Sequence, residues 1–399
     1  MISRIVIGSG SPYQLGFLHG QQARAGVRYN VHAFLTHMHT AGYSRDTVLG
    51  MSRENADVLK PHWQEQLAGI AEGAHLTYGE VLAYNFYHDL VSPDECTVFF
   101  AAGKSSATGE TVFAKNSDKV GGESLVGANF FKFKEINVIV CEELKNGHKI
   151  VGVTAAGSAG LKMGMNNRCM AGGANIARTE ELYEKNLDLT EIRALDRGYL
   201  LRLGLEQENI LEATKVVSNK IMELPMGTPG NLEFVDAREG YIIEGSYDRL
   251  AVKKIVDDVD SRSNRFITLE YLNKKDDVSS ICRYWRTQEL LQAKKGNVTF
   301  QDLVGWSQDH TNGPGPNSIC RHGTHCREEV SLSAMVVELN TKEPNKSRFG
   351  ICLGKPCHAW RHPEGQVFGD LSMTQKDIPE GFVNGEVFKK FYEEGARSE

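Results

Sequence analysis

The feature of this sequence that most constrains its fold is an abrupt change of pattern at Cys96. Before it, apolar side chains recur at helical spacing through almost the whole leading segment. From Cys96 to about Asn175, short apolar runs are separated by Gly, Asn and Ser turns, a pattern typical of strands. Strands grouped together, with helices grouped around them, indicate layers of helix, sheet, sheet and helix rather than alternating βαβ units. The predicted fold class is therefore α+β, a four-layer αββα sandwich with a helical N-terminal segment.

Local signals divide the leading segment into helices. Ser11 and Pro12 form an N-cap and first-turn pair that opens the first helix. Thr77 and Glu80 form a capping box that opens the last one. Two further helices are predicted between them, one on each side of Pro61, which ends the earlier helix.

The rest of the chain alternates between blocks of strands and blocks of helices. Predicted strands are TVFFAA, ETVFAK, GANFFKFK, NVIVCE, KIVGVTAA and CMAGGAN, then 232–235, 241–245, 332–339 and 348–352. Predicted helices are 195–206, 210–217, 279–293 and 300–309. The tail beyond Pro356 shows an irregular pattern. Because no repeat or low-complexity linker interrupts the chain, we expect one compact domain.

Charge and composition exclude some classes of partner. The net charge is -6, and the basic residues are scattered rather than clustered as a nucleic-acid surface requires. No apolar run approaches the roughly 20 residues that span a bilayer, and the first residues lack the apolar core of a signal peptide. The cysteines are dispersed over a long chain, unlike a secreted disulfide framework. We expect a cytoplasmic protein with no membrane or nucleic-acid partner.

Cys96 stands at the first position of a predicted strand, directly after a turn that Pro93 and Asp94 favour. An N-terminal nucleophile (Ntn) needs this position once the preceding peptide bond is cut. By residue type alone, a buried structural cysteine is the better default. The neighbouring motifs favour the nucleophile.

Six motifs follow one another along the chain: GSPYQLGFLHG (10–20), LAGIAEGA (67–74), DECT (94–97), ETVFAKNSD (110–118), AGLKMGMNNRCMAGGAN (159–175) and SICRHG (318–323). In this order they resemble the acyl-coenzyme A:6-aminopenicillanic acid acyltransferase family of self-processing Ntn cysteine hydrolases. The resemblance implies the αββα Ntn fold and self-cleavage between Glu95 and Cys96. Residues 1–95 would then form a helical short chain that stays associated with a catalytic chain of residues 96–399. Glu95 replaces a glycine that precedes the cysteine in a member of the family.

A terminal cysteine carries its own base. A thiol with a pKa of about 8.5 is only a few per cent thiolate at neutral pH, whereas a freed α-amine has a pKa of about 7.7–8.0. Cys96 is therefore expected to act twice. Its thiol first attacks the Glu95 carbonyl, and later attacks an amide or thioester substrate to form an acyl-enzyme.

Acyl transfer needs donors where the oxyanion develops. By resemblance, Asn264 in RSNRF is the leading candidate, and Asn175 in GGANIA is the second, although Asn is also common at turns. Asp118 aligns with the acid near the new α-amine, and otherwise would close a turn between Lys115 and Lys119.

Arg321 aligns with the arginine behind the nucleophile, where its guanidinium can donate to Asp118 or to a substrate carboxylate. The alternative for Arg321 is a surface salt bridge. Thr97 and Ser318 are predicted as supporting hydrogen-bond donors.

The C-terminal quarter gathers cysteines and histidines that could indicate zinc. They are Cys320, His322, His325, Cys326, Cys352, Cys357, His358 and His362. His358 and His362 have HxxxH spacing, but no CxxC pair accompanies them and Pro363 follows at once. We therefore expect no metal and no organic cofactor. Acyl-coenzyme A is possible as an acyl donor, although no motif for binding its pyrophosphate is found.

The sequence thus predicts an Ntn cysteine amidohydrolase, or an acyltransferase if an amine replaces water as the second attacker. Its partner would be a small amide or acyl substrate. Two alternatives stay open. Because of Glu95, the chain could be an uncleaved binding or scaffold protein. It could also be a thiol hydrolase that works without cleavage, with His88 or His310 as an outside base.

Overall fold

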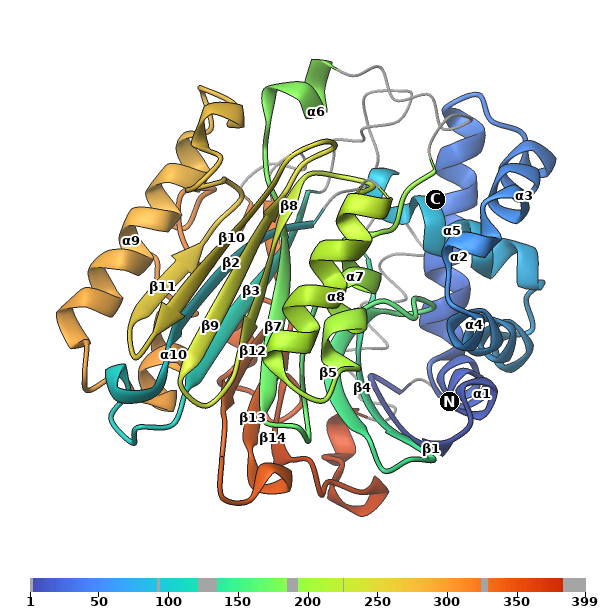
Figure 1. Ribbon diagram of the computed structural model, residues 1–399. Coiled ribbons are helices and arrows are strands. Elements are labelled where there is room, and N and C mark those ends of the chain that lie inside the picture. The colour runs from blue at the N-terminus through green and yellow to red at the C-terminus, as the bar shows by residue number, and fades with distance from the viewer. Residues whose placement is uncertain are drawn as a thin grey trace.

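The computed structural model describes residues 3–91, 94–120, 135–184, 193–224, 226–323 and 329–382. Two sheets lie face to face at its centre (Figure 1). The strands of the larger sheet are β1 (Ile5–Gly10), β4 (Asn137–Leu144), β5 (Lys149–Ala155), β6 (Met163–Asn166), β7 (Met170–Ile176), β8 (Gly230–Val235), β9 (Glu239–Gly245) and β10 (Leu250–Val256). Those of the smaller sheet are β2 (Asp94–Ala101), β3 (Val112–Val120), β11 (Val259–Arg262), β12 (Glu329–Glu338), β13 (Arg348–Leu353) and β14 (Gln366–Asp370).

Strand order places the start of β2 near the middle of the structure. The described strands follow the order β1-β4-β5-β6-β7-β8-β9-β10 in the larger sheet and β11-β2-β3-β12-β13-β14 in the smaller. In the smaller sheet β2 lies between β11 and β3, antiparallel to both. It also packs across the interface against β7 of the larger sheet. The first residues of β2 can therefore be reached from both sheets.

Helices cover the two outer faces. On the larger sheet lie α1 (Pro12–Gln22), α2 (Arg24–Thr40), α4 (Pro61–Ala74), α5 (Tyr78–Val91), α7 (Arg197–Leu205) and α8 (Ile210–Glu223). Outside them, α3 (Arg45–Glu54) packs against α5 and α2. On the smaller sheet lie α9 (Val278–Lys294), α10 (Phe300–Trp306) and α11 (Pro356–Ala359). A short helix, α6 (Glu180–Glu184), follows β7. The predicted α+β class and its four layers are confirmed.

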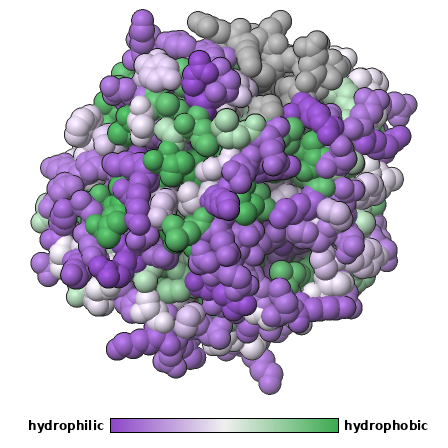
Figure 2. Space-filling view, viewed as in Figure 1, coloured by the Kyte–Doolittle hydropathy of each residue, from purple (hydrophilic) through white to green (hydrophobic). Residues whose placement is uncertain are grey.

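Three apolar cores fill the spaces between these layers. The inter-sheet core includes Val98, Phe100 and Phe113 from the smaller sheet. A second core lies under the helices of the larger sheet, and a third lies between the smaller sheet and α9, α10 and α11. The face shown in Figure 2 is mainly hydrophilic, with apolar side chains in scattered groups. None of the helices in the described ranges combines the length and apolar character that a bilayer span requires.

The leading segment is mostly helical, with one strand at its start. Ser11 accepts from the Gln14 amide and Pro12 opens α1, and Thr77 and Glu80 form the predicted capping box before α5. The additional strand is β1, which runs parallel to β4 at the edge of the larger sheet. Its run IVIGSG is too short and apolar for periodicity to separate a strand from a helix.

Two motifs of the leading segment have a packing role. α1 and α4 cross so closely that a Cβ added at Gly16 would collide with the Gln66 carbonyl, and one at Gly69 with the Tyr13 carbonyl. Glycine is required at both positions because the two backbones touch there. These positions lie within the GSPYQLGFLHG and LAGIAEGA motifs.

Later predictions were correct for most strands and incomplete for others. The strands predicted over 332–339 and 348–352 correspond to β12 and β13. The sequence analysis missed β10 and β11, and the irregular pattern predicted for the tail was wrong over β14, which pairs with β13. The predicted strand GANFFKFK lies outside the described residues.

Candidate active site

Cys96 is the third residue of β2 and not the first residue of the strand, as the sequence had predicted, because Asp94 and Glu95 already pair with β3 in the uncut chain. It pairs with Ser117 of β3 and is completely buried. Because side chains alternate along a strand and Val98 and Phe100 belong to the inter-sheet core, the Cys96 thiol also faces the space between the sheets. Glu95 and Thr97 face the opposite side, toward α9.

The backbone nitrogen of Cys96 is held by Asn264, which follows β11. The Cys96 N–H donates to Asn264 Oδ1 at 3.2 Å, and Arg283 Nη2 donates to the same oxygen at 2.7 Å. Two donors at one atom identify it as the amide oxygen. Asn264 Nδ2 donates to the Ile176 carbonyl at 2.9 Å. Asn264 was expected as an oxyanion donor; in the intact chain it is an acceptor for the nitrogen that cleavage would free.

Arg283 of α9 binds Cys96 as well, at its backbone carbonyl. Its Nη1 donates to the Cys96 carbonyl at 2.7 Å and to Thr97 Oγ1 at 2.8 Å. Arg283 is completely buried, and burial lowers the pKa of its guanidinium to about 10, so that it stays charged at neutral pH. The sequence analysis missed Arg283. A signal was present, because Ser-Ile-Cys-Arg occurs twice, at 280–283 and at 318–321.

The side chain of Glu95 enters a cluster of arginines. Its carboxylate accepts from Arg321 Nη1 at 2.5 Å and also contacts Arg178, while Arg283 lies 3.8 Å away. Glu329 pairs with two of these arginines, at 2.8 Å from Arg178 and 2.7 Å from Arg321. Glu95 is 2% exposed, so these guanidinium groups are what compensates its buried charge.

Asp118 of β3 lies beside Glu95 in the strand register. Its Oδ2 is 3.7 Å from Arg321 Nη1, and Ser331 Oγ donates to Oδ1 at 2.6 Å. Burial raises the pKa of Asp118 above its ordinary value, with Arg321 and Arg283 acting in the opposite direction. The structure therefore brings Asp118 and Arg321 together next to the predicted cleavage site.

The larger sheet supplies polar groups on the inter-sheet face. Asn175 of β7 pairs with Asn231 of β8, and alternation places both side chains on the face that Glu233 shares. Asn175 Nδ2 donates to the carbonyl of Arg262 at 3.2 Å, but the Oδ1 atoms of Asn175 and Asn231 have no hydrogen-bond partner among the described residues. Buried unsatisfied acceptors are rare in native proteins and call for an explanation, such as an absent ligand or water.

Two ionisable side chains lie on the same inter-sheet surface. Burial raises the pKa of Glu233 to about 8, and neither of its carboxyl oxygens has a partner within the described ranges. Lys115 is completely buried and donates to the carbonyls of Lys162 and Ala174 at 2.6 and 2.7 Å. Lys115 is two positions from Ser117 on β3, so its ammonium shares the face of the Cys96 thiol.

The remaining predicted residues lie at different distances from this cluster. Thr97 is bound by Arg283, whereas Ser318 donates to the Gly313 carbonyl in a turn. His88 donates from Nδ1 to the Tyr84 carbonyl at 3.0 Å and lines a cavity of about 30 Å³ that Cys96 does not line. Burial lowers the pKa of His88, which favours the neutral imidazole. His310 stacks edge-on against His322, in a group of side chains described below.

Comparisons with known proteins give remote similarities. No protein-family model matches the chain. An uncharacterised protein of Archaeoglobus fulgidus is 25% identical over 189 residues, which are 42% of this chain and 32% of the relative. The chain thus aligns with about a third of that relative's length.

Three solved structures with a similar arrangement were found among others. They are an N-acylethanolamine-hydrolyzing acid amidase orthologue from Caenorhabditis elegans (12% identity, TM-score 0.41, covering 65% of this chain and 99% of that one), a conjugated bile acid hydrolase mutant from Clostridium perfringens (9%, 0.42, 71% and 95%) and a penicillin V acylase from Agrobacterium tumefaciens (11%, 0.38, 65% and 83%). With these scores and identities, the fold assignment depends on the sheets and layers described above.

Proposed function

We propose that this chain is a self-processing Ntn cysteine amidohydrolase whose first substrate is its own Glu95–Cys96 bond. The observation that carries the proposal is that buried side chains hold both the backbone N–H and the backbone carbonyl of Cys96. Asn264 Oδ1 accepts a hydrogen bond from the Cys96 N–H, and Arg283 Nη1 donates one to the Cys96 carbonyl. Both partners are buried and come from segments more than 160 residues away in sequence, 168 for Asn264. Every buried backbone group needs a partner, but β11 pairs with β2 only from Val98 onward, so at Cys96 polar side chains take the place of a neighbouring strand.

Self-cleavage follows from attack of the thiol on the adjacent carbonyl. The Cys96 sulfur adds to the Glu95 carbonyl carbon, the C–N bond breaks as a C–S bond remains, and the thiol proton passes to the departing amine. Water then hydrolyses the thioester, which releases the Glu95 carboxyl group and restores the thiol. The products are a leading chain that ends at Glu95 and a catalytic chain that begins at Cys96.

The freed α-amine then serves as the base for other amides. With a pKa of about 7.7–8.0 it can take the proton of the thiol at neutral pH. Asn264 Oδ1 is positioned to accept a hydrogen bond from this amine, which orients its lone pair for the thiol. Asp118 and Arg321 lie beside the bond that is cut, so their side chains would help to hold the freed amine in place. Asn175 and Asn231 offer unsatisfied polar atoms to a substrate between the sheets.

The leading chain should stay bound after cleavage. Asn30 Nδ2 donates to the carbonyls of Ile136 and Ala156 at 3.0 and 2.9 Å, and Asp89 pairs with Arg197 at 2.6 Å. β1 also remains hydrogen-bonded to β4. These contacts join the two products without a covalent bond, so the enzyme would be a heterodimer made from one chain.

Intact-mass spectrometry and N-terminal sequencing of purified protein test the proposal. We expect two species, one of which begins with Cys96, that co-elute under native conditions and separate under denaturing ones. The same preparation should hydrolyse small amides with loss of activity on thiol alkylation.

A single full-length species without amidase activity would favour the scaffold alternative, and a full-length active species would favour a hydrolase with an outside base. Added amines that divert the acyl group from water would indicate acyltransferase activity.

The side chain of Glu95 indicates which acyl groups the mature site accepts. Glu95 is the acyl side of the bond that is cut, and its carboxylate is bound by Arg321 and Arg178. An acyl group of the same length that ends in a carboxylate, such as glutaryl, would make the same charge-assisted contacts. The preferred substrates are therefore amides of acidic acyl groups, provided that residue 95 withdraws after cleavage.

Glutaryl amides of a fluorescent amine should be hydrolysed faster than the matched glutaramoyl amides, in which a neutral amide replaces the carboxylate. We expect kcat/KM to differ about 10- to 100-fold, since a hydrogen bond to a charged group contributes about 1.5–3 kcal/mol. Arg178→Met should reduce the preference. Arg193→Met, which removes an exposed pair with Asp57, is the matched control and should leave it intact. Equal rates for the two amides in the cleaved enzyme would overturn the assignment of acyl group while leaving self-processing in place.

A further inference from the structure

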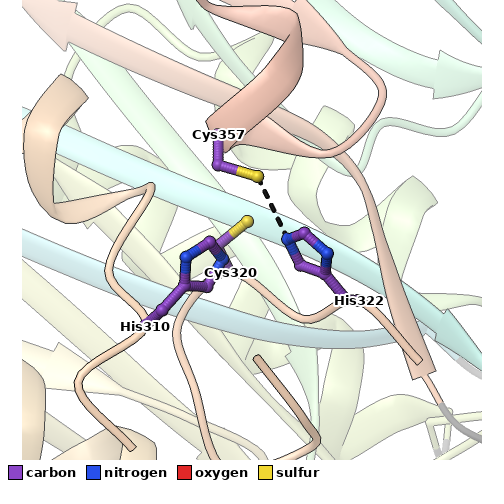
Figure 3. Close-up of side chains that lie close together, drawn as sticks. All are labelled: His310, Cys320, His322 and Cys357. Atoms are coloured by element: carbon purple, nitrogen blue, oxygen red, sulfur yellow. Dashed lines mark hydrogen bonds between the residues drawn. The ribbon is translucent and has the colours of Figure 1, made fainter. Parts of the chain in front are cut away.

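Four metal-ligating side chains from three separate segments converge outside the candidate active site (Figure 3). His310 lies in the turn after α10, Cys320 and His322 flank Arg321, and Cys357 belongs to α11. The sulfur and ring-nitrogen atoms of the four all lie within 4.8 Å of one another. His322 Nε2 is 3.1 Å from Cys357 Sγ.

This spacing is close to that of a tetrahedral zinc centre. With Zn–S near 2.3 Å and Zn–N near 2.0–2.1 Å, tetrahedral ligand atoms are separated by about 3.3–3.8 Å. To close around an ion, the widest pair would contract by about 1–1.5 Å at most and the His322–Cys357 pair would widen slightly, changes that side-chain rotation can supply. Two thiols and two imidazoles are a ligand set that zinc prefers, and four protein ligands are typical of a structural site.

Burial gives a second, independent indication. Cys320 is completely buried and Cys357 is 7% exposed. His310 Nε2 is a buried nitrogen with no hydrogen-bond partner among the described residues. A buried ring nitrogen without a hydrogen-bond partner is unfavourable. The arrangement is expected, however, where this nitrogen and the two sulfur atoms share a cation.

We propose that His310, Cys320, His322 and Cys357 bind a structural zinc ion. The site departs from the sequence-based expectation of no metal, which considered the HxxxH pair. His358 lies near the group, with its ring 5.7 Å from that of His322, but is not part of it. The spacing of the four ligands matches no short zinc motif, because the fold rather than the local sequence brings them together.

The ion would fix the segment that carries Arg321. Cys320 and His322 are its immediate neighbours, and Cys357 joins them to α11 against the smaller sheet. The same segment is also held by Asn116, whose Nδ2 donates to the carbonyl of Ile319 at 2.9 Å. Zinc would thus restrict the guanidinium that contacts Glu95, although zinc binding itself does not depend on the proposed activity.

Metal analysis of the untagged full chain, produced with zinc in the medium and dialysed extensively, is the direct test. We expect about one zinc per chain, as for other structural sites. Cys320→Ser and Cys357→Ser should each lose the bound zinc. Cys141→Ser, at a cysteine with the same 7% exposure as Cys357, and His358→Gln, beside the group, should retain it.

Cobalt substitution provides a readout that does not depend on how the variants fold. Wild-type protein that is stripped of zinc and loaded with Co²⁺ should show thiolate-to-cobalt charge-transfer absorption and the intense visible bands of tetrahedral coordination. Wild-type protein without zinc that also takes up no tetrahedral cobalt would overturn the proposal. So would zinc that remains in the Cys320→Ser/Cys357→Ser double variant, or a disulfide between these two cysteines in protein purified under reducing conditions.

Discussion

Replacing Cys96 with alanine should leave the chain uncut and abolish its amidase activity. The variant removes the sulfur that attacks the Glu95 carbonyl, so that denaturing electrophoresis should show one full-length band where the wild type shows two. Amide hydrolysis should fall by about 10⁶-fold, the scale of loss when a catalytic nucleophile is removed. The fold should persist, because alanine keeps the Cys96 backbone contacts to Asn264 and Arg283 and deletes one buried atom.

A second cysteine variant separates nucleophile chemistry from packing. Cys141 is also buried in the inter-sheet core, so Cys141→Ala removes the same atom from the same layer. We expect normal cleavage and activity in that variant, with a stability loss of about 1–2 kcal/mol from the small cavity. Two fragments in the Cys96→Ala protein would show that another residue, or a contaminating protease, cuts the chain. Activity in uncut Cys96→Ala protein would rule out the Cys96 acyl-enzyme altogether.

Local sequence signals predicted the elements that depend on local physics. The capping pair at Ser11 and Pro12 and the capping box at Thr77 mark helix starts because their hydrogen bonds close within one turn. The switch at Cys96 marks the layered sheets because hydrophobic periodicity changes there. β10 and β11 were missed because their sequences lack the apolar pattern that marks the other strands. LAVKKIV carries exposed lysines at the edge of its sheet, and VDSR is a buried strand made largely of polar residues.

The candidate site shows where sequence reasoning ends. Asp118 and Arg321 could be proposed from their motifs, and the structure places them 3.7 Å apart. Arg283 could not be placed, because it contacts Cys96 across 187 residues and lies in a helix whose pattern resembles that of any amphipathic helix. The repeated Ser-Ile-Cys-Arg was visible, but only the three-dimensional structure shows that both arginines lie near Glu95. Three of the four proposed zinc ligands stood in the cysteine and histidine group of the C-terminal quarter, but their irregular spacing did not separate them from its other members or connect them with His310.

Replacing Arg283 with methionine should slow self-cleavage and destabilise the fold. The change removes the donor to the Cys96 carbonyl, to Thr97 Oγ1 and to Asn264 Oδ1. We expect about 3–5 kcal/mol of lost stability in denaturant unfolding, the usual effect of removing one member of a buried charged network. Cleavage should slow by about 10²-fold, because Asn264 then loses the contact that fixes its oxygen against the nitrogen of residue 96.

The matched control is Arg286→Met, which alters the same helix one turn later. Arg286 is partly exposed and pairs with Asp309 and Glu289, so its loss should change stability by less than about 1 kcal/mol and leave cleavage unchanged. Cleavage rates are compared at a temperature where both variants are fully folded, since this separates positioning from stability. Arg283→Lys keeps the charge without the planar fork and should recover stability more than rate. If Arg283→Met protein cleaves itself as fast as the wild type, Arg283 only stabilises the fold, and Asn264 alone must hold the nitrogen that becomes the catalytic base.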